Sequence, residues 1–180
     1  MTKFMKTLAV ATACAGSLLC VSATAQTAPP AAAAQSYTPA QEQRFQTFQT
    51  NMQNKTLSQD YNAIVDCAGY AAYIHGMMKA AKAPEQATKN SGMFAQSFIM
   101  SSILVGMLND PQNTTPESVQ AVIKSNAQTY SAVYPGDAVF RDDSSKAKFE
   151  TCTSYGKVNN ALLSLARQAM AQQQQQATPQ

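Results

Sequence analysis

The chain has 180 residues, 45% of them hydrophobic, and carries 13 Lys and Arg against 10 Asp and Glu. This length corresponds to one domain of ordinary size. The weak net charge and dispersed basic residues exclude the electrostatic pattern of a nucleic-acid-binding protein or of one held by anionic lipid.

The first 25 residues have the three parts of a secretory signal peptide. Lys3 and Lys6 precede an apolar run over 8–21, and Ala23-Thr24-Ala25 has the small-x-small pattern of a cleavage site. We predict cleavage before Gln26 and a periplasmic or secreted product. Loss of Lys3 and Lys6 leaves 11 basic against 10 acidic residues, a net charge of +1.

The mature chain divides into three segments. Residues 26–38 form a Pro/Ala-rich flexible leader, residues 39–171 a helical domain, and residues 172–180 a Gln-rich disordered tail. Because the signal run is shorter than the roughly 20 residues that span a bilayer, and no later segment has the required length and apolarity, we expect no stable membrane insertion after cleavage.

Apolar residues recur at helical spacing through the domain, and no alternating run reaches strand length. Thr38-Pro39 and Thr115-Pro116 are typical of helix starts, and Pro84 and Pro111 interrupt the pattern between them. The expected helices lie near residues 39–52, 58–82, 85–108, 116–130 and 146–170. This pattern predicts an all-α, single-domain bundle of about five helices, with the second and third as its central hairpin.

Two cysteines remain after signal cleavage, Cys67 and Cys152, separated by 85 residues. A lone pair in an oxidising compartment most simply forms a disulfide, which would tie the second helix to the last. The chain has no C-x-x-C motif that would favour a redox or metal site instead.

The segment 66–70 resembles the Cys-x-Gly-Tyr opening of a family of periplasmic immunity proteins. The resemblance covers only these residues and lacks the downstream pattern of that family, so no residue role is carried over. Acid-stress chaperones are another class of small exported helical protein with a single long-range disulfide. Both classes act by binding.

Catalytic motifs are absent from the sequence: it has one histidine, no Gly-x-Ser-x-Gly, no His-Glu-x-x-His and no phosphate-binding glycine loop. Asp66 lies nine residues before His75 and therefore on the opposite side of the same helix. Asp137, Asp142 and Asp143 could line a calcium loop, but without EF-hand spacing they favour a solvated turn and a charge at the start of the last helix. We predict that the protein is not an enzyme and that it binds no cofactor.

Methionine usage offers one alternative. Met93, Met100 and Met107 are spaced by sevens, which favours a core-facing helical stripe and leaves an apolar binding groove open. His75 with Met77 and Met78 could instead hold Cu(I), because thioether and imidazole ligands suit that ion.

Tyr70, Tyr73 and Met77 form the candidate partner surface, since tyrosine and methionine are common in interfaces. The sequence thus predicts an exported, non-enzymatic helical protein that acts by protein–protein binding or structural support, immunity-like or chaperone-like in class. We expect an unidentified protein partner, with a homodimer as one form of it, and no nucleic acid. A periplasmic copper or small apolar ligand carrier that uses His75 and methionines is the alternative.

Overall fold

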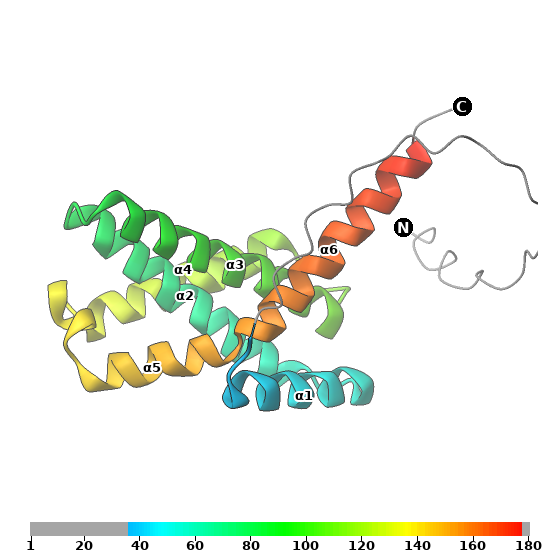
Figure 1. Ribbon diagram of the computed structural model, residues 1–180, viewed down its shortest axis with the longest axis horizontal. Coiled ribbons are helices and arrows are strands. Elements are labelled where there is room, and N and C mark those ends of the chain that lie inside the picture. Colours follow the sequence, from blue (N-terminus) through cyan, green and yellow to red (C-terminus); the bar gives the residue numbers. More distant parts are fainter. Residues whose placement is uncertain (1–35, 178–180) are drawn as a thin grey trace, which may run out of the picture. The chain divides into compact units, whose positions relative to one another are not determined.

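A computed structural model describes residues 36–177, and the predicted signal peptide and most of the leader lie outside this range. The described residues form six α-helices and one short 3₁₀-helix, with no strand among them, which confirms the all-α class (Figure 1). The elements are α1 (Pro39–Asn54), α2 (Ser58–Ala80), α3 (Glu85–Asn109), α4 (Pro116–Val133), η1 (Gly136–Phe140), α5 (Asp143–Ser154) and α6 (Gly156–Ala177).

The predicted helix starts at Thr38 and Thr115 are confirmed. Each threonine accepts a hydrogen bond from the backbone N–H three residues on, and the Gln41 or Ser118 side chain accepts from the threonine N–H in return. These reciprocal bonds satisfy N–H groups that a helix start otherwise leaves unpaired.

Helices α2 and α3 form the central antiparallel hairpin. The start of α2 meets the end of α3, where Ser58 Oγ donates to Asn109 Oδ1 at 3.3 Å. On its other side α2 packs against α4, so it is covered on two faces. The core members that are fully buried include Ile64 and Tyr70 of α2, Phe98 and Val105 of α3, and Val119 of α4.

One expectation about the chain is wrong: α3 is long and apolar enough, by length and composition, to cross a membrane. Composition alone does not separate a spanning helix from the core helix of a bundle. Here α3 buries Phe98 and Val105 against its neighbours and exposes its other face.

The single last helix expected over 146–170 is two helices, α5 and α6, which change direction at Tyr155-Gly156. Gln41 Nε2 of α1 donates to the Thr153 carbonyl at 3.0 Å, near the end of α5. A Cβ on Gly156 would stand 2.8 Å from the same Nε2 atom. The glycine therefore lets α1 approach the junction, and the glutamine satisfies a carbonyl at the helix end.

Helix α6 continues into the segment predicted as a tail and ends at Ala177. Its first part buries Val158 and Leu162 in the core. From Arg167 to Gln174 every side chain is exposed, and the helix projects beyond the others (Figure 1).

The predicted disulfide is confirmed: Cys67 and Cys152 are bonded, with their Cα atoms 5.5 Å apart. Two further contacts join the same helices, from Tyr70 Oη to Ser145 and from Lys148 Nζ to Asp66. Because Cys67 is bonded to Cys152 near the end of α5, while Tyr70, later in α2, contacts Ser145 near its start, the two helices are antiparallel.

Candidate functional site

Tyr70 and Tyr73 do not form the surface predicted for them, because both are buried in the core. The Tyr70 hydroxyl lies 2.7 Å from the Ser145 carbonyl and 2.8 Å from Ser145 Oγ, and the Tyr73 hydroxyl donates to the Tyr134 carbonyl. The apolar rings fill the core and each hydroxyl finds a partner inside it, so neither is available to another protein.

Asp66 lies in a network of side chains from three helices. Its Oδ1 accepts from Tyr130 Oη at 2.8 Å and its Oδ2 pairs with Lys148 Nζ. Burial, followed by the bond to Asp66, raises the pKa of Tyr130 well above its usual value. The Tyr130 ring also stands edge-on to Tyr70, with the ring centroids 5.2 Å apart. The carboxylate therefore joins α2, α4 and α5.

Sequence reasoning did not single out Asp60, the most buried acid of the described chain. Its Oδ2 accepts from Asn51 Nδ2 at 2.8 Å, and its carboxylate also contacts Tyr155. Asn51 belongs to α1, and Tyr155 lies at the junction of α5 and α6. Asp60 thus has a structural role at the base of α2.

The acidic loop is a turn and a helix start, as the sequence favoured. Asp137 pairs with Arg141 and Asp143 with Lys146, while Asp142 accepts from the Ser144 and Ser145 N–H groups at the start of α5. The Ser144 hydroxyl also donates to Asp142. This bond, followed by those from the backbone N–H groups, lowers the pKa of the Asp142 carboxyl. Among the described residues no group of three or more His, Cys, Asp or Glu could hold a metal ion.

The methionine stripe, defined as Met93, Met100 and Met107 of α3, faces outward, which corrects the core-facing interpretation. The three side chains are 52%, 45% and 48% exposed, and Leu108 beside them is also exposed. The opposite face of α3 carries Phe98 and Val105 into the core. The seven-residue spacing correctly places the methionines on one face of α3, but this is the face that no other helix of the described chain covers.

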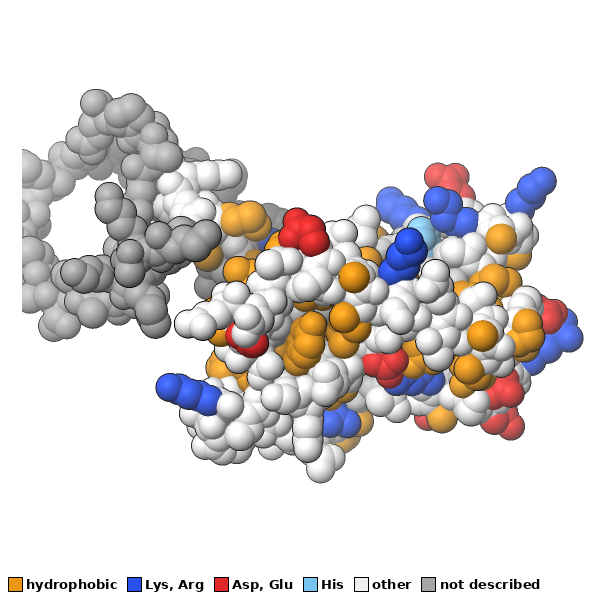
Figure 2. Space-filling view, turned by 180° about the vertical axis from the view of Figure 1, so that it is seen from behind, with side chains coloured by type: hydrophobic (Ala, Val, Ile, Leu, Met, Phe, Trp, Pro, Cys, Tyr) orange, Lys and Arg blue, Asp and Glu red, His pale blue; other side chains and the backbone are white. Residues whose placement is uncertain are grey.

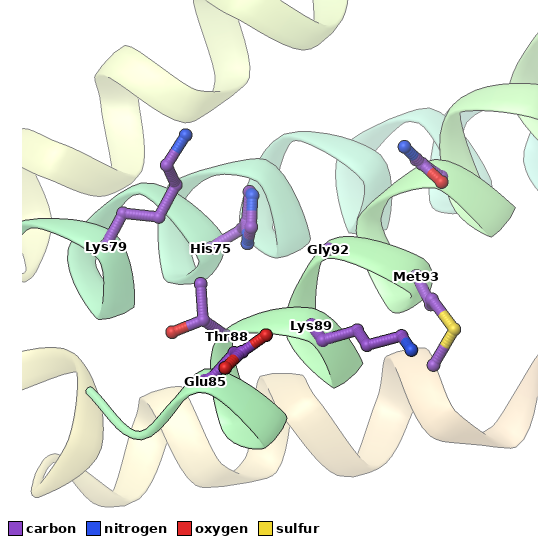
Figure 3. Close-up of a pocket in the computed structure, with 8 residues that line it drawn as sticks. His75, Lys79, Glu85, Thr88, Lys89, Gly92 and Met93 are labelled. Carbon is purple, nitrogen blue, oxygen red and sulfur yellow. The ribbon is translucent and has the colours of Figure 1, made fainter. Parts of the chain in front are cut away.

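A hollow of about 510 Å³ opens at the other end of this stripe, where the end of α2 meets the start of α3. We call it the His75 hollow. Figure 2 shows the single histidine at the surface among lysine side chains, and Figure 3 shows it between Lys79 and Lys89. The lining residues are His75, Lys79, Glu85, Thr88, Lys89, Gly92, Met93 and Gln96.

The surrounding bonds fix the orientation of the His75 ring. Ser91 Oγ donates its single proton to the Thr88 carbonyl at 2.8 Å and lies 3.0 Å from His75 Nδ1. The serine must therefore accept from Nδ1–H, which leaves Nε2 as the unprotonated nitrogen of the neutral ring. Nε2 has no hydrogen-bond partner among the described residues. A Cβ on Gly92 would stand 3.0 Å from the ring, so the glycine lets the ring lie against α3.

The lining of the His75 hollow is more cationic than anionic. Lys79, Lys89 and Glu85 contribute two positive charges and one negative, and none of them forms an ion pair within the described chain. Met77, one of the proposed copper ligands, instead packs against the hydrophobic core. Met78 is half-buried and does not line the hollow.

One feature of the sequence indicates the hollow, namely the four-residue spacing of two pairs of its lining residues. Lys79 follows His75 by four residues, and Met93 follows Lys89 by four, so each pair shares a helix face. Only the packing of α2 on α3 brings the two pairs together. No family model matches the chain, and no significant match occurs among curated proteins or solved structures.

Proposed function

We propose that this chain is an exported, non-enzymatic helical protein that binds a protein partner through the methionine stripe of α3. The exposure of Met93, Met100 and Met107 carries the proposal. Residues 93 to 107 cover about 21 Å of helix at 1.5 Å per residue, the length of a helix–helix contact. A partner that docks there, an immunity target or a chaperone client for example, would bury side chains that otherwise face water.

Methionine suits such a surface because its thioether chain is flexible and polarizable. Exposed methionines on a helix can repack around partners of different shape. The stripe continues into Leu108, which is 54% exposed. Several large apolar side chains exposed along one helix face are more typical of an interaction site than a single exposed residue is.

A non-enzymatic role is supported by how the acidic groups are used. Asp60, Asp66 and Asp142 each serve the fold, as a bridge between helices or as a helix cap. His75 is oriented by a serine hydroxyl rather than by a carboxylate. No general acid–base pair is assembled around it.

Site-specific crosslinking tests the partner surface. A photoreactive residue at position 100 should give one discrete covalent adduct in the export compartment, and Met93→Gln with Met107→Gln should reduce its yield several-fold. The same photoreactive residue at Val133, an even more exposed apolar position outside the stripe, is the control. Equal adduct yields from positions 100 and 133 would count against the proposal.

The compartment is tested separately, by the mass of the protein purified from the periplasm. We expect the mass of a chain that begins at Gln26, with an increase of two hydrogens on reduction. A chain that retains Lys3 and Lys6 would contradict export through a cleaved signal.

Copper binding by His75, Met77 and Met78 is the less supported alternative. Met77 packs against the core, and two lysines line the same hollow as His75 and would repel a cation. His75→Ala should leave Cu(I) binding unchanged in a titration. Stoichiometric binding that this variant abolishes would restore the alternative.

A further inference from the structure

We infer that the His75 hollow binds a small organic carboxylate, with the acid group attracted by the lysines of its lining and an apolar body over Met93. This inference goes beyond the partner-binding proposal and does not rest on it. The volume of the His75 hollow, about 510 Å³, lies within the range of small-molecule sites.

The charge of the lining selects an anion. Lys79 comes from α2 and Lys89 from α3, and neither is neutralised by an ion pair in the described chain. Glu85 is the one acid of the lining. Two unpaired ammonium groups that border one hollow attract a carboxylate and repel a metal cation.

Two polar side chains complete the lining. The Gln96 side chain carries an amide donor at the edge of the hollow. The bond from Nδ1 to Ser91 holds the His75 ring in place. A ring held by the fold loses little freedom when a ligand binds, which favours affinity.

The apolar part of the ligand follows from Met93. Met93 is 52% exposed at the mouth of the hollow, where it leads on to Met100. An inorganic anion would leave this side chain uncovered, whereas an alkyl carboxylate covers it.

The single histidine makes the test site-specific. We would titrate the mature, disulfide-bonded protein with octanoate and follow the imidazole ¹⁵N signals of His75, which no other residue can contribute. Octanol and acetate serve as probes that keep only the apolar chain or only the acid group. The inference predicts a saturable shift with octanoate and at least tenfold weaker effects of the other two.

Substitutions then locate the charge. Lys79→Gln with Lys89→Gln should weaken octanoate binding by about tenfold or more, since these lysines supply the positive charge of the lining. Lys124→Gln with Arg167→Gln removes the same charge from residues outside the hollow and should not weaken it. Met93→Gln should weaken octanoate but not acetate.

Three results would overturn the inference. The first is that octanoate does not shift the His75 signals. The second is that octanol or acetate binds as well as octanoate. The third is that the Lys79→Gln, Lys89→Gln variant binds octanoate as well as the Lys124→Gln, Arg167→Gln control does. Met107 belongs to the methionine stripe but does not line the hollow, so the single variant Met107→Gln should weaken the partner crosslink and leave octanoate binding unchanged.

Discussion

Two glycines of α2 show how much a single side chain matters where helices approach each other. A Cβ on Gly69 would overlap the Cβ of Asn126 and stand 3.1 Å from both the Ala127 nitrogen and the Ile123 oxygen of α4. A Cβ on Gly76 would meet nothing within 4 Å. The first glycine is needed for packing and the second is not.

We therefore predict opposite effects of two identical substitutions. Gly69→Ala should lower the free energy of unfolding by about 2 kcal/mol or more, because the backbone of α4 must move. Gly76→Ala should raise it by about 0.5–1 kcal/mol, since alanine favours helix over glycine. Urea unfolding followed by far-UV circular dichroism measures both, and effects of the same sign would contradict the packing argument.

At the scale of the element, α5 depends on its contacts with α2. The helix has 12 residues, too few for stability by itself in water. Asp66, Cys67 and Tyr70 of α2 bind Lys148, Cys152 and Ser145 of α5, respectively. These bonds distribute the attachment over nearly the whole of α5.

Removal of the disulfide should loosen α5 first. Cys67→Ala with Cys152→Ala should lower the free energy of unfolding by about 2–4 kcal/mol, because the loop that it closes is long. Amide hydrogen exchange should accelerate more in residues 143–154 than in α1, where no such bond is lost. A uniform acceleration throughout the domain would show that the bond stabilises the whole fold instead.

At the scale of the whole molecule, buried tyrosines make stability depend on alkaline pH. Burial raises the pKa of Tyr70, Tyr73, Tyr130 and Tyr155, which lie in α2, in α4 and at the α5–α6 junction. A pKa that is higher in the folded state means that the fold favours the neutral phenol. Stability from this source is complete below the unfolded pKa near 10 and falls as the pH rises above it.

Urea midpoints measured from about pH 8 to pH 11 should therefore fall above about pH 10, where the unfolded chain loses its phenolic protons. Tyrosinate absorbance reports the same ionisation directly, since the chain has no tryptophan. Tyr130→Phe should flatten the dependence. A midpoint that stays constant through this range would contradict the burial of these hydroxyls.

Local chemistry allowed the sequence to predict much of the fold. Thr38 and Thr115 carry their capping information within four residues, and prolines at 39 and 116 add to it. The break between α5 and α6 was missed because a lone glycine, Gly156, is compatible with a continuous helix. What distinguishes it is the approach of Gln41, a residue of α1.

The candidate sites were less predictable, because spacing shows which side chains share a helix face and not which face another helix covers. The same periodicity is consistent with the buried Tyr70 and Tyr73 and with the exposed Met93, Met100 and Met107. The assignment of inside and outside depends on neighbours that are distant in the chain.

The sequence by itself determined the helical class, most helix starts and the Cys67–Cys152 pairing. Caps and prolines act through local chemistry, and these two cysteines are the ones outside the predicted signal peptide. Only the tertiary structure decided that the tyrosines are internal, that the methionine stripe faces outward, and that His75 shares a hollow with Lys89. Each of these depends on how α2, α3 and α4 pack, and packing follows from the shape and volume of all the contacting side chains together.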